Sequence, residues 1–228
     1  MIDVAANWER VCLQVERAAR KAGRDPRTIR IVAVSKTKSV ELIDTAIRAG
    51  VTDIGENYVQ EAADKIARIG TRVTWHMIGH LQRNKVGRAV ELFDIIHTLD
   101  SVALGEALAR HGERRNRPVR VLIEVNLAAE ASKHGIAPER TQSLLETLAR
   151  QRWIVVDGLM AVPPAGPAES IRPCFRALRE LRDSLNQKAQ ATTPLRELSM
   201  GMSDDFVVAI EEGATMVRIG RAIFDARS

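Results

Sequence analysis

Aromatic residues, cysteines and long apolar runs are all scarce in this sequence of 228 residues. Aromatic side chains make up only 4% of the chain, so a buried core has to be built mainly from aliphatic residues. The two isolated cysteines, Cys12 and Cys174, form no metal-ligand or redox spacing, which favours free, buried or half-buried thiols and a reducing compartment. No apolar run approaches the ~18 residues that span a bilayer, and no secretory signal opens the chain. We therefore expect a cytoplasmic protein without a membrane segment.

The sequence also lacks an internal linker and a strongly basic patch. No Pro/Gly/Ser-rich stretch divides it, and 45% apolar with 28% charged residues is ordinary for one globular domain. Lysine and arginine number 34 against 29 aspartates and glutamates, an excess that favours phosphate-bearing ligands. The densest basic cluster, residues 110–120, includes Glu113 and no aromatic residue. That composition is typical of a solvated helix end and loop, so we expect no nucleic-acid partner.

What is present is a regular alternation of strand-like and helix-like segments. Eight β-branched or apolar runs are predicted as strands, at 29–36, 52–57, 73–78, 94–99, 119–126, 153–161, 195–200 and 215–219. Amphipathic segments predicted as helices follow them, at 40–49, 58–69, 82–92, 101–110, 138–150, 171–191, 204–212 and 221–226.

This pattern predicts an α/β protein, a single (β/α)8 TIM barrel spanning residues 1–228. A further helix over 5–22 lies in the leading segment 1–28, which is expected to pack on the barrel. A doubly wound open sheet is the alternative. The eight regular units and the absence of a GxGxxG motif favour the barrel.

The first predicted strand ends on a lysine, Lys36. Ligands of parallel α/β folds bind at the carboxyl ends of the strands, and in an extended strand Lys36 shares a face with Val32 and Val34. Desolvation in an apolar crevice would favour the free amine, which attacks carbonyl carbons. Lys36 is therefore a candidate for a Schiff base. The alternative interpretation is a solvated loop lysine, like its neighbour Lys38.

Polar residues also lie at the ends of other predicted strands, but a single one proves little. Asn57 and Asn126 fit loop-capping roles as well as ligand contacts, and His76 fits an interior, hydrogen-bonded histidine better than a base. Thr98 has no functional argument in its favour.

The last two units have the pattern of a phosphate site. Glycines at strand-to-helix turns let backbone N–H groups close on a phosphate, and barrels frequently bind phosphate in the loops after strands seven and eight. The candidate residues here are Ser199, Gly201, Met202, Ser203 and Gly220. The competing interpretation is helix capping by Ser203 and the two acids that follow it, which would oppose a phosphate unless their side chains point away.

Arg218 lies on the eighth predicted strand, on the face that also includes Met216. If that face lines the barrel, a guanidinium stands beside the phosphate loops and across from Lys36. A lysine for an aldimine, a phosphate cradle and an inward arginine describe a pocket for pyridoxal 5′-phosphate (PLP). A permanent cation at the pyridine nitrogen keeps that nitrogen unprotonated and disfavours extensive carbanion chemistry.

Several blocks of the sequence resemble the pyridoxal phosphate homeostasis protein family, whose barrel is shared with the N-terminal domain of alanine racemase (fold type III). These blocks are residues 33–38, 55–61, 75–85, 126–135, 158–161, 199–204 and 216–220. The resemblance implies that PLP is attached to Lys36, that Arg218 faces the pyridine nitrogen, and that Asn57 and Met160 lie near the cofactor. It places the phosphate among Ser199, Gly201, Met202, Ser203 and Gly220. No role follows from it for Lys38, His76, Asn126 or Lys133.

The resemblance also implies a function without catalysis. Alanine racemase has a C-terminal β domain and a second catalytic tyrosine, whereas this sequence ends at Ser228 and its only tyrosine is Tyr58. Racemisation needs an acid/base on each face of the substrate. The expected role is to hold PLP as a lysine aldimine, to release it to the apo forms of PLP-dependent enzymes, and to maintain vitamin B6 and amino-acid pools. We expect a monomer. The alternatives are a PLP-dependent amino-acid racemase and a Schiff-base aldolase.

Overall fold

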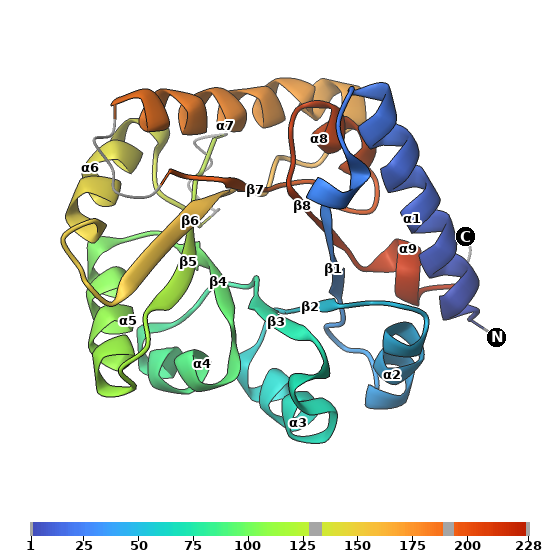
Figure 1. Ribbon diagram of the computed structural model, residues 1–228, viewed down its shortest axis with the longest axis horizontal. Coiled ribbons are helices and arrows are strands. Elements are labelled where there is room, and N and C mark those ends of the chain that lie inside the picture. Colours follow the sequence, from blue (N-terminus) through green and yellow to red (C-terminus); the bar gives the residue numbers. More distant parts are fainter. Residues whose placement is uncertain (1, 128–133, 189–193, 227–228) are drawn as a thin grey trace.

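The computed structural model describes residues 2–127, 134–188 and 194–226, and at its centre the strands form a closed parallel barrel (Figure 1). Each strand pairs with the next along the chain, and β8 pairs with β1. The strands of the described chain are β1 (Arg30–Val34), β2 (Asp53–Glu56), β3 (Thr74–Met77), β4 (Ile95–Leu99), β5 (Val119–Glu124), β6 (Ile154–Met160), β7 (Glu197–Ser199) and β8 (Met216–Ile219). The predicted (β/α)8 barrel is confirmed.

Helices cover the outside of this barrel, as Figure 1 shows. After the successive strands come α2 (Val40–Arg48), α3 (Val59–Ile69), α4 (Val86–Leu92), α5 (Val102–Arg114), α6 (Pro138–Leu148), α7 (Ala168–Lys188), α8 (Phe206–Glu211) and α9 (Arg221–Phe224). None of the helices in the described ranges combines the length and the apolar character of a bilayer span.

The leading helix α1 (Val4–Lys21) lies beside α8 and α9 (Figure 1). Asp3 caps its first turn, and its buried residues recur at helical spacing. Asn7 is 4% exposed and donates to the Ile223 carbonyl over 3.0 Å. These contacts join the first helix to the last turn of the described chain.

Most differences between the predicted and observed elements are at their ends. β1 ends at Val34 because a turn follows, in which the Lys38 N–H donates to the Ser35 carbonyl over 3.0 Å. The helix predicted from residue 204 begins at Phe206, because Ser203 to Asp205 form the preceding turn. The helix predicted over 171–191 starts earlier, at Ala168, and runs to Lys188, and residues 189–191 lie outside the described ranges.

The two faces of the barrel differ in composition. The outward face and the helices share one large aliphatic core, in agreement with the low aromatic content. Inside the barrel a small separate cluster contains Leu122, Met160 and Met216. TIM barrels usually fill this space with branched aliphatic residues. Here buried polar side chains occupy part of it, and they lead to the functional site.

Candidate functional site

Lys36 follows β1 by two residues and is exposed. The Ser35 N–H still pairs with the Gly55 carbonyl over 3.0 Å, so the backbone remains on the barrel up to the residue before the lysine. Lys36 therefore lacks the expected shelter of an apolar crevice, because the strand ends before it and it lies in the exposed turn that follows. The next residue, Thr37, has φ 64°, a left-handed conformation that is strained for a β-branched side chain.

A buried ionic brace holds both neighbours of Lys36. Lys65 of α3 is 5% exposed and donates over 2.6 Å to the Ser35 carbonyl, over 2.7 Å to Glu56 and over 2.7 Å to Glu61. Glu61 in turn accepts the Thr37 N–H over 2.6 Å. Ser35 donates its hydroxyl to Glu56, whose pKa is raised because burial outweighs these hydrogen bonds. The brace keeps the strained turn, and with it the backbone of Lys36, in one conformation.

Arg218 points into the barrel, as the alternation of β8 predicts. It is 4% exposed and in register with Val32 of the neighbouring strand β1. Its Nη1 donates over 2.7 Å to both the carbonyl and the hydroxyl of Ser199, and its Nη2 donates over 2.9 Å to the Ala161 carbonyl. Desolvation lowers the pKa of Arg218 to about 10, so the group remains a cation at neutral pH. These contacts leave the Nε–H without an acceptor among the described residues.

The turn after β7 requires glycine at position 201. Gly201 has φ +94°, and a Cβ there would lie 2.6 Å from the Ala209 side chain. The predicted tension with the two acids remains at Asp204, whose side chain lines the same cavity as Ser203, where its charge is paired with Arg221. Asp205 instead accepts the Met202 N–H over 2.5 Å. That N–H therefore already has an acceptor within the turn.

The remaining candidates for the phosphate lie around the same turn. The Ser203 hydroxyl oxygen accepts the Ala222 N–H over 3.3 Å, and its own proton stays available to a ligand. Ser203 lines an open cavity of about 630 Å³ together with Arg10 and Arg221. Gly220 begins α9, and a Cβ there would lie 3.3 Å from the Val34 carbonyl, next to β1.

Asn57 and Met160 lie on other strands of the same barrel. Asn57 is half-buried just after β2, and a Cβ on Gly79 would lie 2.3 Å from its carbonyl oxygen, so these two strand-end loops touch. Met160 is fully buried at the end of β6. Of the unassigned candidates, Thr98 donates to the Gly79 carbonyl over 2.8 Å, and Lys133 lies outside the described residues.

Glu124 at the end of β5 is a site residue that the sequence interpretation missed. It is 7% exposed, and its Oε2 has no hydrogen-bond partner among the described residues. Burial raises the pKa of Glu124 to about 7, although the charge of Arg218 opposes the shift. The signal was available, because Leu122 lies inside the barrel and alternation then places Glu124 inside as well.

Glu124 is expected to make stability depend on pH. Its pKa of about 7 in the folded state exceeds the ordinary glutamate value of 4.5, so the stability that the neutral carboxyl contributes is present below pH 4.5 and is lost as pH rises through 7. We expect the free energy of unfolding to fall by about 3 kcal/mol over this range. Chemical denaturation at a series of pH values should show this fall in the wild type and not in Glu124→Gln. The exposed Glu139→Gln is the control, and parallel profiles for wild type and Glu124→Gln would contradict the assignment.

Two histidines that the sequence analysis did not bring together also lie inside the barrel. His76 of β3 and His97 of β4 are both fully buried, with His76 Nδ1 2.9 Å from His97 Nε2. The interpretation of His76 as an interior, hydrogen-bonded histidine is confirmed. His97 had no motif of its own. The pairing of β3 with β4 brings it to His76, and the barrel fold brings it to Ser199 of β7.

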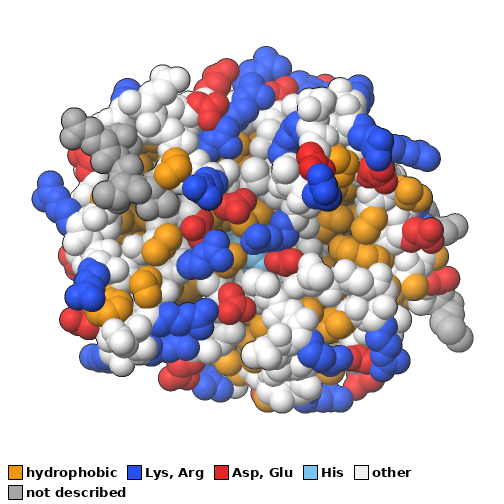
Figure 2. Space-filling model, in the orientation of Figure 1, with side chains coloured by type: hydrophobic (Ala, Val, Ile, Leu, Met, Phe, Trp, Pro, Cys, Tyr) orange, Lys and Arg blue, Asp and Glu red, His pale blue; other side chains and the backbone are white. Residues whose placement is uncertain are grey.

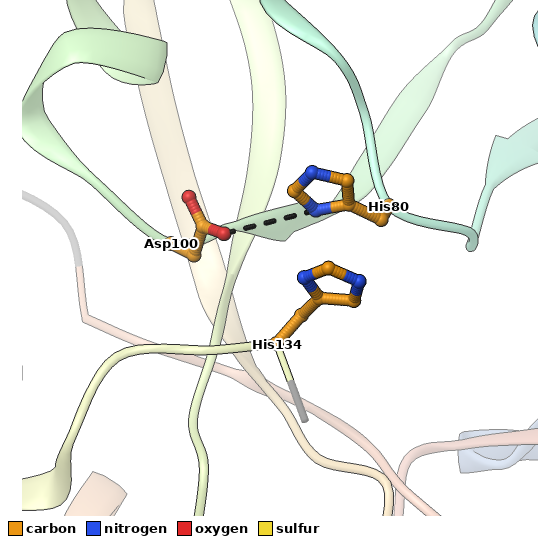
Figure 3. A group of neighbouring side chains, drawn as sticks. All are labelled: His80, Asp100 and His134. Carbon is orange, nitrogen blue, oxygen red and sulfur yellow. Dashed lines mark ion pairs between the residues drawn. The ribbon is translucent and has the colours of Figure 1, made fainter. Parts of the chain in front are cut away.

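A second group of titratable side chains lies on the loops after β3, β4 and β5. Figure 3 shows His80, Asp100 and His134, with His80 Nδ1 3.8 Å from an Asp100 oxygen. The two imidazoles are stacked with an interplanar angle of 9°, so their in-plane lone pairs run parallel and do not converge on one point. In this arrangement the group does not form a metal site.

The fold and two of its side chains point to one class of barrel proteins: the parallel barrel is closed, a lysine follows its first strand, and an arginine of its last strand points inward. Residues 11–228 match the family model "Alanine racemase, N-terminal domain". The alanine racemase of Clostridium difficile 630 has the same fold, with a TM-score of 0.73 and 13% identity over 97% of this chain and 56% of that one.

Within that class, the chain belongs to the pyridoxal phosphate homeostasis protein family. The protein of that name from Pseudomonas aeruginosa is 41% identical over 100% of this chain and 97% of its own length. Its namesake from Escherichia coli K12 is 39% identical over 100% of this chain and 98% of its own length. PipY of Synechococcus elongatus PCC7942, solved with PLP bound, superposes with a TM-score of 0.82 and 36% identity, covering 92% of this chain and 99% of PipY.

Proposed function

We propose that this chain binds PLP, holds it covalently on Lys36, and maintains the intracellular pools of vitamin B6 and of amino acids. The observation that supports this most strongly is the placement of the exposed Lys36 just after β1 and of the buried cation Arg218 in the adjacent strand β8. The names of the relatives from P. aeruginosa and E. coli, and the PLP bound to PipY, point to the same cofactor.

The residues at this end of the barrel fit the parts of the cofactor. Arg218, whose Nε–H has no acceptor in the described part of the chain, is assigned to the pyridine nitrogen. Asn57 and Met160 are assigned to the neighbourhood of the ring. The phosphate is assigned to the two turns after β7 and β8, among Ser199, Gly201, Met202, Ser203 and Gly220. We further propose that residues 1–228 act as one PLP-binding domain, monomeric and cytoplasmic, with apo forms of PLP-dependent enzymes as recipients.

PLP supplies an aldehyde that condenses with a primary amine and releases water. Lys36 supplies the amine, and the brace under Ser35 and Thr37 fixes its backbone. Exposure of Lys36 leaves the attachment open to water and to competing amines, which suits a protein that gives its cofactor away. Arg218 adds a permanent positive charge beside the ring, where it disfavours carbanion chemistry. These features support a carrier without catalysis of its own.

The alternative is an amino-acid racemase, which needs an acid/base on each face of the substrate. Tyr58 does not provide it, because its side chain is 62% exposed at the start of α3. Glu124, with its pKa of about 7, is the group that favours this alternative. The test is whether the PLP-loaded protein exchanges the α-proton of an amino acid in deuterated water. Exchange that is lost in Glu124→Gln would show that the protein is an enzyme and not a carrier.

The proposal is tested by trapping the cofactor. The protein is incubated with PLP, reduced with sodium borohydride, digested and analysed by mass spectrometry. We expect one reduced pyridoxyl-phosphate group on the peptide that contains Lys36, with an absorption band in the visible region before reduction. A label spread over many lysines, or absent from Lys36, would contradict the proposal. A phosphorylated sugar bound in place of PLP would favour the aldolase.

A further inference from the structure

The barrel interior contains a continuous row of polar side chains, three of which, Asp53, His76 and His97, have no part in the proposed function. They come from β2, β3, β4, β7 and β8, and are Asp53, His76, His97, Ser199 and Arg218, here called the interior relay. All of them are at most 7% exposed. Aliphatic residues usually fill this space in such barrels, so a polar row needs a physical reason.

Every consecutive pair in the interior relay is within hydrogen-bond distance. Asp53 Oδ1 is 2.9 Å from His76 Nε2, and His76 Nδ1 is 2.9 Å from His97 Nε2. His97 Nδ1 is 3.0 Å from the Ser199 hydroxyl, which is 2.7 Å from Arg218 Nη1. The row therefore joins the Asp53 carboxylate of β2 to the Arg218 guanidinium of β8 without a gap, by way of β3, β4 and β7.

The Asp53 end of the interior relay lies where the strands of the barrel begin. Asp53 is the first residue of β2, and its Oδ1 is 3.5 Å from Arg30 Nε, at the first residue of β1. Both line a cavity of about 340 Å³ with Glu197 and Thr215. Figure 2 shows acidic and basic side chains interleaved over the middle of the barrel, with histidine visible among them. The interior relay thus connects this end of the barrel with the site end.

The charges of the members determine which atoms donate. Burial opposes ionisation of Asp53, but hydrogen bonds from His76 and Thr52 hold the pKa of Asp53 below its usual value, so it only accepts. Burial lowers the pKa of His76 and places that of His97 well below its usual value. A neutral imidazole has one donor and one acceptor nitrogen.

The direction of the whole row follows. His76 donates from Nε2 to Asp53, so its Nδ1 accepts, and His97 donates from Nε2 to it. His97 Nδ1 then accepts the Ser199 hydroxyl proton, and the Ser199 oxygen accepts from Arg218. Each donor strengthens the next by polarisation, because all the bonds point the same way.

We propose that Asp53, His76, His97 and Ser199 are positioning residues that hold the guanidinium of Arg218 in its ligand-binding orientation. The proposal rests on the assignment of Arg218 to the cofactor ring. A cluster that only satisfied its own buried groups would stabilise the fold without affecting the ligand. The two cases differ in one respect: a positioning role transmits a change at Asp53 to the bound cofactor, and it does so through Ser199.

The first experiment measures proton positions in the unliganded wild type. Long-range ¹H–¹⁵N spectra of ¹⁵N-labelled protein distinguish the two imidazole tautomers, with His76→Asn and His97→Asn used for assignment. We expect both rings to be neutral with the proton on Nε2. A proton on Nδ1 of either ring, or a charged ring, would overturn the relay. This measurement needs neither PLP nor Lys36, so it separates failure of the relay from failure of the proposed function.

The second experiment measures transmission to the cofactor. Asp53→Asn allows the His76 ring to take the other tautomer, and loss of about one hydrogen bond's contribution is expected to raise the Kd for PLP about fivefold and to shift the visible band. Ser199→Ala removes the hydroxyl that links His97 to Arg218. In that background, Asp53→Asn is expected to change neither the Kd for PLP nor the visible band.

The matched control is Asp157→Asn. Asp157 also forms an ion pair at this end of the barrel, with Arg120 at 2.8 Å, but contacts no relay member. Any of three results would overturn the proposal. The Kd for PLP could be unchanged in Asp53→Asn, Asp53→Asn could have the same effect with and without the Ser199 hydroxyl, or Asp157→Asn could have the same effect as Asp53→Asn. If Asp53→Asn does not fold, the wild-type tautomers still decide the question.

Discussion

Lys36→Ala is expected to abolish covalent attachment of PLP, with complete loss of the visible band and of the borohydride-stable label. The reason is chemical: the substitution removes the primary amine that condenses with the aldehyde. Stability should change little, because the Lys36 side chain is exposed and has no ion pair among the described residues. The measurement is an absorbance titration with PLP, followed by reduction and intact-mass analysis.

Lys38→Ala is the control for this loss. Lys38 lies two residues away and is half-buried, and its Nζ pairs with Asp225 over 2.5 Å, so it is held away from reaction with an aldehyde. We expect this variant to bind and retain PLP like the wild type. Two results would assign the cofactor to another lysine: Lys36→Ala still forms the reduced adduct in equal amount, or Lys38→Ala loses it.

Lys65→Met is expected to lower the free energy of unfolding by about 3–5 kcal/mol, as is usual when one partner of a buried ion pair is removed. Glu56 is fully buried and would keep only the Ser35 hydroxyl as a donor, while the Ser35 carbonyl would lose the Lys65 ammonium. Urea denaturation of the wild type and the variant, with unchanged m-values, measures the difference.

The partner substitution identifies the cause of this loss. In the double variant Glu56→Gln/Lys65→Met the buried charge is gone, and the Gln oxygen still accepts the Ser35 hydroxyl. We expect the double variant to recover most of the stability lost in Lys65→Met. A loss below about 1 kcal/mol in the single variant, or no recovery in the double variant, would show that the brace contributes little.

Much of the fold was predictable because its signals are local. β-branched runs alternating with amphipathic segments require neighbours only within a few residues, and the closed barrel confirmed their order. The element ends were less predictable. Position 36 is a clear case. The strand was predicted to continue to Lys36, but the turn between Ser35 and Lys38 ends it at Val34, and the lysine is exposed.

The same distinction applies to the site. Alternation along β8 placed Arg218 and Met216 on one face, and the structure shows that this face lines the barrel. The glycine at 201 indicated a turn, in agreement with its φ of +94°. Glu124 could have been found by the same alternation. His97 could not, because its partners Ser199 and His76 lie 102 and 21 residues away, and no motif records which strands close next to one another in register.

The sequence by itself determined the eight-unit barrel and the family, and it led to the two residues, Lys36 and Arg218, on which the proposed PLP site rests. These properties follow from the period of apolar residues and from the chemistry of individual side chains. Only the tertiary structure decided that Lys36 is exposed, that Asp205 accepts the Met202 N–H, and that Asp53 is linked to Arg218. It also decided that Glu124 is buried and that its Oε2 has no hydrogen-bond partner in the described part of the chain. Burial and hydrogen-bond partners depend on which distant segments meet, and that is set by closure of the barrel.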